Sequence, residues 1–257
     1  MEVISPAGPT YGTVLIRKAE NGEVEVGPIQ AGQNFVRSLA YSPSGDRIAS
    51  GGSNKTICIW DSNTGELLVG PIKGLGSWVE SIVWSSDSSK LYSASDKFAR
   101  VFDSVSGTEL NRFEHNNYVH SVALSPKHNV LACVGLGWIA QLWDTESYQP
   151  LGNPFSPEDS VELGCVSFSR DGRYLAYGGD DKKITLWTVK DIAPELPVCT
   201  SIGIHQGNNL HSRKFNLSPH HLSLKSVLSH STSTFSCSPV LHRLMPQTLL
   251  RDPEVMT

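Results

Sequence analysis

The stretch Thr56–Pro71, TICIWDSNTGELLVGP, decides the fold. Its first five residues alternate in the manner of a β-strand, Asp61 to Gly65 is rich in turn-forming residues, and Leu67 to Val69 predicts a second strand that ends at Gly-Pro. We therefore expect a β-hairpin whose first strand finishes on Trp-Asp. Such a hairpin becomes decisive when it recurs at a fixed interval, because a period of roughly 20 to 50 residues indicates a repeat architecture.

The Trp-Asp ending recurs at intervals of 41 to 44 residues. Its copies are Trp60-Asp61, Phe102-Asp103, Trp143-Asp144 and Trp187-Thr188. A degenerate copy stands 43 residues before the first, with Arg17 at the Trp position. A second marker, a serine-containing turn, keeps the same register and begins at Ser42, Ser85, Ser125 and Ser169. Two markers in one register indicate a repeat protein rather than isolated hairpins.

These residues resemble the WD40 repeat family, in which each unit of about 40 to 45 residues forms one four-stranded blade of a β-propeller. The resemblance implies an all-β fold over residues 11–198, with a partial blade at 11–31 and blades at about 34–73, 77–114, 117–153 and 161–198. The Gly-Pro-Ile ending of the fourth strand is further similar to the WD repeats of fungal incompatibility-type signalling NTPases. Seven blades need about 300 residues, so the count predicts an open or incomplete propeller, or a small ring.

Both ends of the chain differ from the repeats in composition. Residues 1–10 contain Ser, Pro and Gly, and residues 199–257 hold six of the nine histidines and no Trp or Tyr. We expect both segments to be disordered, because neither can bury enough apolar surface to order itself. The alternative that residues 199–257 are a coding artefact stays open. The tail histidines lack acidic or thiol partners at fixed spacing, so no metal site is expected.

Composition and motifs disfavour several functional classes. There is no apolar run of about 20 residues, no readable secretory signal and no C-x-x-C, so we expect a cytoplasmic protein with no membrane span. The tail carries a net charge of +3 and the rest of the chain −7, so the repeats offer no footprint for nucleic acid. No nucleophile-elbow or Walker motif is present. We expect no catalytic residue and no cofactor.

The family resemblance assigns one series of residues to the framework. In the family a His before the first strand, a Ser or Thr in the second, an Asp in the next turn and the Trp of Trp-Asp form a hydrogen-bonded set. The Trp-Asp positions hold Trp60, Asp61, Phe102, Asp103, Trp143, Asp144 and Trp187, and the turn positions hold Asn54, Asp96, Gly137 and Asp181. The strand positions hold Ser50, Ser93, Cys133 and Tyr177, and only His115 fills the His position. No unit has the complete set, so stability is expected to come mainly from burial between blades.

A second series is the candidate partner-binding site. Its residues stand just before the first strand of each unit and just before the turn Asp, positions that the family places on the top face of the propeller. They are Phe35, Trp78, Tyr118 and Glu162, and Ser53, Ser95, Leu136 and Asp180. Aromatic residues exposed together predict an interaction hot spot. The alternative is that they only cover the mouth of the central channel.

We therefore expect a non-catalytic scaffold that binds a protein or peptide partner on the top face. Two alternatives stay open: a truncated propeller fragment without independent function, and a hydrolase built on a propeller. Open blade edges further predict self-association, because an unpaired strand edge invites pairing with another chain.

Overall fold

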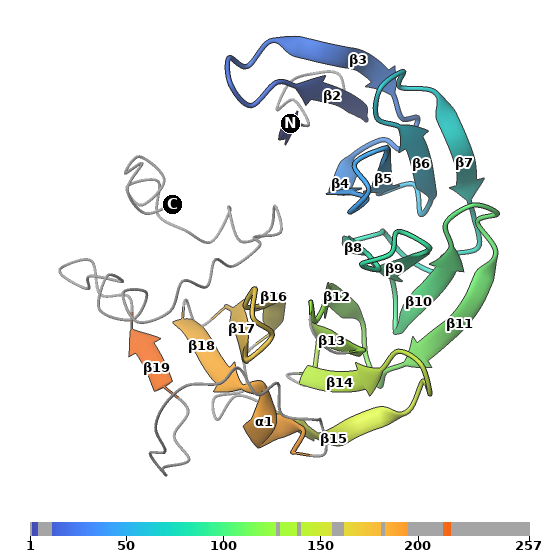
Figure 1. Ribbon diagram of the computed structural model, residues 1–257. Coiled ribbons are helices and arrows are strands. Elements are labelled where there is room, and N and C mark those ends of the chain that lie inside the picture. The colour runs from blue at the N-terminus through green and yellow to red at the C-terminus, as the bar shows by residue number, and fades with distance from the viewer. Residues whose placement is uncertain are drawn as a thin grey trace. The chain divides into compact units, whose positions relative to one another are not determined.

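The computed structural model describes residues 2–4, 12–126, 129–137, 140–155, 162–180, 183–194 and 213–216 (Figure 1). Most of these residues lie in antiparallel strands, which form five sheets. The fold is all-β, as the sequence predicts. Within the described ranges no helix is long and apolar enough to cross a membrane, since α1 (Val189–Ile192) has four residues.

The first sheet has three strands and the others have four, always in sequential order. The first consists of β1 (Glu2–Ile4), β2 (Thr13–Arg17) and β3 (Val24–Gln30), and the second of β4 (Val36–Tyr41), β5 (Arg47–Gly52), β6 (Ile57–Asp61) and β7 (Leu67–Ile72). The third consists of β8 (Ser81–Trp84), β9 (Lys90–Ala94), β10 (Phe98–Asp103) and β11 (Glu109–Glu114). The fourth consists of β12 (Val119–Leu124), β13 (Val130–Gly135), β14 (Ala140–Asp144) and β15 (Pro150–Phe155), and the fifth of β16 (Leu163–Phe168), β17 (Tyr174–Gly179), β18 (Lys183–Thr188) and β19 (Arg213–Asn216).

The chain divides into two compact units, Met1–Val122 and Ala123–Thr257. Each unit has its own apolar core, built where one sheet packs against the next. In the first unit Ile16 of β2 clusters with Trp60 of β6, and Ile59 of β6 clusters with Ile82 of β8. In the second unit residues of β13 and β14 cluster with residues of β16 and β17. Burial between neighbouring sheets therefore accounts for the core of each unit.

A short strand lies in each of the two terminal segments. Glu2–Ile4 form β1 and pair with Leu15–Arg17 of β2, although the sequence predicts no structure there. Arg213–Asn216 form β19 and pair with Lys183–Leu186 of β18, although they belong to the segment predicted to be disordered. The predicted half-blade is thus a three-stranded sheet, and a tail segment supplies the fourth strand of the last sheet. The remainder of residues 1–10 and 199–257 lies outside the described residues.

A polar chain crosses the second sheet and includes a residue that the sequence analysis missed. The indole Nε1 of Trp60 donates to Oγ of Ser50 at 2.8 Å. The buried Gln33 donates from Nε2 to the backbone oxygens of Ser50, at 3.0 Å, and of Thr56, at 2.9 Å. The Thr56 hydroxyl donates to Oδ1 of Asn54 at 2.8 Å. Gln33 therefore donates where the family pattern has His, and the set in this sheet is more complete than the sequence predicts.

The same positions differ in the other sheets. The side chain of Phe102 carries no N–H, and the buried Oγ of Ser93 has no hydrogen-bond partner in the part of the chain that the structure describes. In the last sheet, Nε1 of Trp187 donates to the Tyr177 hydroxyl at 3.2 Å. Trp60 and Phe102 are buried, whereas Trp143 and Trp187 are only half-buried.

The Asp of each Trp-Asp copy closes the turn that follows its strand. Oδ1 of Asp61 accepts the backbone N–H of Asn63 at 2.8 Å and of Thr64 at 2.9 Å. Asp103 and Asp144 accept the N–H groups two and three residues further on in the same way. The hydrogen bond from the Thr64 N–H is the main cause of the lowered pKa of Asp61. These aspartates therefore serve the turns that follow their strands.

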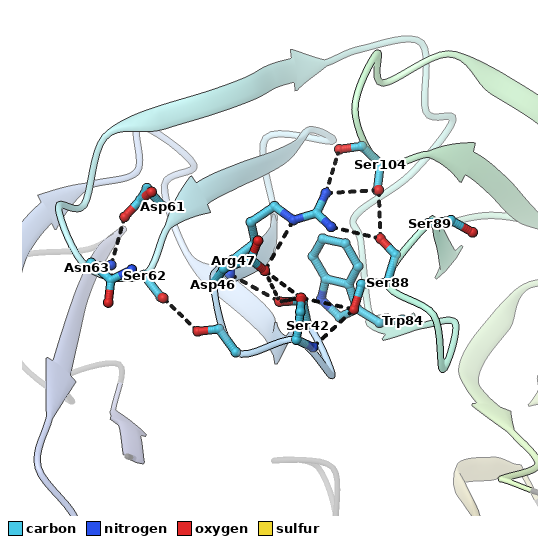
Figure 2. Close-up of polar contacts among 12 residues, drawn as sticks. Ser42, Asp46, Arg47, Asp61, Ser62, Asn63, Trp84, Ser88, Ser89 and Ser104 are labelled. Carbon is cyan, nitrogen blue, oxygen red and sulfur yellow. Dashed lines mark hydrogen bonds and ion pairs between the residues drawn. The ribbon is translucent and has the colours of Figure 1, made fainter.

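Polar contacts also join the second and third sheets (Figure 2). The Arg47 guanidinium donates to the backbone oxygen of Ser88 and to Oγ of Ser104, both at 3.0 Å, and lies 5.1 Å from the centroid of the Trp84 ring. The Trp84 indole in turn donates to the Ala40 carbonyl at 2.9 Å. Figure 2 shows Arg47 pointing from its own strand toward the serines of the neighbouring sheet. These contacts hold the two sheets together at one end of their strands.

We expect Ser50→Ala to lower the free energy of unfolding by about 1–3 kcal/mol, because the buried indole N–H of Trp60 loses its acceptor. Ser93→Ala is the matched control at the same position of the next sheet. It removes a buried hydroxyl without a described partner, so it should leave stability unchanged or raise it. Urea unfolding followed by circular dichroism measures both variants. Equal losses of stability in the two variants would show that the Trp60–Ser50 hydrogen bond does not account for the effect.

We expect a pH dependence of stability that begins near neutrality and originates at His115. Burial lowers the pKa of this half-buried residue to about 4, whereas an unfolded His titrates near about 6.5. Its contribution to stability is therefore complete above pH ~6.5 and is lost as the pH falls toward 4. The free energy of unfolding should drop by about 2 kcal/mol over this window, allowing for the partial exposure of the ring. Urea titrations across the window should show a smaller drop for His115→Gln, and an unchanged profile would refute the assignment.

Candidate interaction surface

The aromatic residues predicted to bind a partner all lie in the first unit. Phe35, Trp78 and Tyr118 are 53%, 48% and 49% exposed. Each stands in the short segment that leads into the first strand of a sheet, before β4, β8 and β12. Large apolar residues on inner strands of the same unit, such as Ile59 and Leu91, are by contrast buried. These three side chains therefore remain accessible although they adjoin well-packed sheets.

Phe35 is held in place by Ser53, the second predicted residue of the same unit. Ser53 donates its backbone N–H to the Phe35 carbonyl at 2.9 Å, and its Oγ accepts the Phe35 N–H at 3.1 Å. The preceding residue, Gly52, lies close to Gln33, because a Cβ at Gly52 would be 2.4 Å from Cβ of Gln33. Ser53 is half-buried and anchors the backbone of Phe35. The two predicted residues thus lie side by side.

Trp78 belongs to a segment that is anchored at Gly76, a residue that the sequence analysis missed. The Gly76 N–H donates to Oδ2 of Asp96 at 3.0 Å, and its carbonyl accepts from Nζ of Lys55 at 3.1 Å. A Cβ at this position would lie 2.2 Å from the Asp96 oxygen. Only glycine fits here without displacing the carboxylate. The backbone two residues before Trp78 is therefore fixed from both sides.

The structure corrects the prediction that Ser95 is a surface residue. Ser95 is only 2% exposed, and its Oγ accepts from Nη1 of Arg100 at 2.8 Å. Arg100 also donates to both carboxylate oxygens of Asp96, at 2.8 and 2.9 Å. Burial raises the pKa of Asp96, but hydrogen bonds from Arg100 and from the Phe98 and Gly76 N–H groups outweigh it and leave the pKa lowered. Ser95 is thus covered by a side chain five residues further along, which also pairs with Asp96.

An ion pair flanks the Trp78 ring. The guanidinium carbon of Arg37 lies 4.7 Å from the ring centroid, and Nε of Arg37 donates to Oε2 of Glu80 at 2.7 Å. Arg37 belongs to β4 and Glu80 to the segment before β8, so the pair joins neighbouring sheets. A cation at this distance from an indole is attracted by the ring quadrupole. The pair therefore orients the indole while leaving about half of the Trp78 side chain exposed.

The predicted residues of the second unit form a different arrangement. Leu136 and Glu162 are half-buried, and Asp180 is exposed. The Asp180 N–H donates to the Glu162 carbonyl at 3.1 Å, the same backbone contact that joins Ser53 to Phe35. Gly137 adopts a φ of 84°, and Asp181 lies outside the described residues. The aromatic series therefore ends with Tyr118.

Groups that could hold a metal ion do not occur in the described ranges, where no three His, Cys, Asp or Glu residues cluster. The six histidines of residues 199–257 fall outside those ranges. The three described cysteines, Cys58, Cys133 and Cys165, are buried free thiols. At the predicted positions, the features available for recognition are thus the exposed aromatic side chains and the charged groups beside them.

A family model described as "WD domain, G-beta repeat" matches residues 26–61, 68–103, 107–144 and 155–188. These segments cover more than half of the chain. This chain belongs to the WD40 repeat family. The first three matched repeats begin at the outer strand of one sheet, β3, β7 or β11, and end at the Trp-Asp position of the next sheet. Each of these repeats therefore contributes strands to two sheets.

Two curated relatives share part of these repeats. The chain is 32% identical over 125 residues to apoptotic protease-activating factor 1 of Rattus norvegicus, an alignment that covers 48% of this chain and 10% of that protein. It is 30% identical over 101 residues to the small ribosomal subunit protein RACK1 of Drosophila melanogaster, which covers 37% of this chain and 31% of that protein. The chain thus matches less than a third of the length of either relative. The similarity to fungal signalling NTPases stays a prediction.

Gly76→Ala is expected to lower the free energy of unfolding by about 1–3 kcal/mol, because the added methyl group displaces the Asp96 carboxylate from the Gly76 N–H and strains its pair with Arg100. Gly164→Ala is the control, since a Cβ there meets nothing nearer than 4.0 Å. Thermal unfolding of both variants measures the difference. A Gly76 variant as stable as the control would show that this anchor is dispensable.

Proposed function

We propose that this WD40 protein is a non-catalytic interaction scaffold that binds a protein or peptide partner through Phe35, Trp78 and Tyr118. One observation carries the proposal: three aromatic side chains stay about half exposed at equivalent positions of consecutive repeats. These three residues are not part of the apolar core clusters between the sheets. A surface of this kind is typical of an interaction hot spot.

The backbone that carries these residues is held in one conformation. Phe35 is bonded to Ser53, and the segment before Trp78 is fixed at Gly76 by Asp96 and Lys55. Binding at such a surface loses little conformational freedom, and an aromatic side chain brings a large contact area with few rotatable bonds. The arrangement therefore favours recognition over a role as a passive cover.

The relatives support the same proposal. Apoptotic protease-activating factor 1 is named for its effect on a protease, and RACK1 is named as a protein of the small ribosomal subunit. Both names refer to proteins that act with other macromolecules. We infer a protein partner for this chain as well, because the acidic body disfavours a nucleic acid. The cytoplasmic location and self-association through strand edges that the sequence predicts belong to this proposal.

The test compares Trp78→Ala with Trp60→Ala. Peptides are first selected on the wild-type protein from a random library displayed on phage, and their binding to each variant is then measured. Trp78→Ala should weaken binding about tenfold or more and leave the unfolding temperature nearly unchanged. Trp60→Ala should lower the free energy of unfolding by about 3–5 kcal/mol, because this indole is 6% exposed.

Val105→Ala is the control for a general loss of exposed apolar surface. Val105 is 77% exposed and lies in the turn between β10 and β11. This variant should bind the selected peptides as the wild type does. Unfolding of Trp78→Ala, or equal binding by Trp78→Ala and the wild type, would contradict the proposed surface.

A further inference from the structure

Lys55 places a positive charge next to the Trp78 segment. It occupies the turn between β5 and β6 in a left-handed conformation, with φ 64°, and its exposed side chain reaches the Gly76 carbonyl at 3.1 Å. An ammonium group has three N–H donors, and this contact uses one of them. Among the described residues no carboxylate lies within ion-pair distance of Lys55. Two donors of this ammonium therefore remain available to a ligand.

Arg37 of β4 provides a second cation with unused donors beside the same segment. Its Nε donates to Glu80, and its guanidinium lies over the Trp78 ring. A guanidinium has five N–H donors, and the two Nη groups that carry four of them make no hydrogen bond to the described residues. The Arg37 side chain is 34% exposed. These Nη groups can donate to a carboxylate while the face of the guanidinium stays against the indole.

The local charge contrasts with that of the chain. Arg37, Lys55 and Glu80 together carry a net charge of +1, whereas residues 1–198 carry −7. Both cations contact the short segment from Gly76 to Glu80, which contains the exposed indole. An anion-binding position thus adjoins an apolar one. The net negative charge of the repeats disfavours a polyanion such as a nucleic acid, and a small acidic group is the ligand that fits the two cations.

We propose that the partner segment bound at Trp78 is an acidic peptide, whose carboxylates are bound by Lys55 and Arg37 while a neighbouring apolar side chain packs on the indole. This inference rests on the proposed function, because it names the chemistry of the partner at the same surface. Lys55 and Arg37 are then the residues that determine specificity. Trp78 supplies the apolar contact that is common to every ligand.

The experiment uses three synthetic peptides of about ten residues with the same apolar anchors and the same rhodamine label. The residues that flank the anchors are Glu in the first peptide, Gln in the second and Lys in the third. Fluorescence anisotropy measures the affinity of the full chain for each. The Glu peptide should bind about tenfold more tightly than the Gln peptide, and the Lys peptide more weakly than either. Raising the salt concentration should reduce the preference.

Lys55→Gln and Arg37→Gln are each expected to weaken binding of the Glu peptide about three- to tenfold and to leave the Gln peptide unaffected. Arg37→Lys keeps the charge and should restore part of the preference. Lys18→Gln is the matched control, because it removes one positive charge from an exposed lysine in the turn between β2 and β3. If Arg37→Gln destabilises the fold, the comparison rests on Lys55→Gln, because the Lys55 side chain is exposed.

The results separate this inference from the proposed function. Equal affinity for the Glu and Gln peptides, with both weakened by Trp78→Ala, would overturn the acidic preference and leave the binding surface intact. Tighter binding of the Lys peptide would overturn it as well. If none of the peptides binds, or if binding survives Trp78→Ala, the proposed function itself fails.

Discussion

The structure depends on the burial of apolar residues between neighbouring sheets. A four-stranded antiparallel sheet has two faces, and one sheet alone cannot remove both from water. In the first unit, residues such as Ile57 and Ile59 on β6 meet Ile82 and Trp84 on β8. Because this contact fixes the strands, the segments that lead into β4 and β8 are fixed as well. Exposed residues on those segments are thereby held in defined positions.

Much of the fold could be predicted from the sequence, because its markers are local. The Trp-Asp ending and the serine-containing turn each act within a few residues: Asp61 bonds the N–H groups just after it, and Ser42 Oγ accepts the N–H of Arg47 at 3.0 Å. Such signals survive in the sequence whatever packs around them. The two strands predicted within Thr56–Pro71 accordingly occur as β6 (Ile57–Asp61) and β7 (Leu67–Ile72).

The features that the sequence analysis did not predict arise from interactions that no local sequence pattern reveals. Gln33 replaces the expected His because an amide can donate the same hydrogen bond, so a search by residue type overlooks it. Ser95 looks like a surface residue until Arg100 folds over it to reach Asp96. The pairing of β19 with β18 depends on the backbone edge that β18 offers, and the four residues of β19 show no alternation that would predict a strand. The exposure of Phe35 and Trp78 was predicted only from the family resemblance, because it depends on how the sheets pack.

The offset between repeats and sheets has a consequence for how such a chain can change over evolutionary time. A repeat that begins with the outer strand of one sheet and ends at the third strand of the next carries the junction between two sheets within itself. Tandem duplication of one repeat would then add one sheet and one junction together, and loss of a repeat would remove both. Every other strand would keep its partner. The number of sheets is therefore free to vary in whole units while each surviving turn and junction keeps its register.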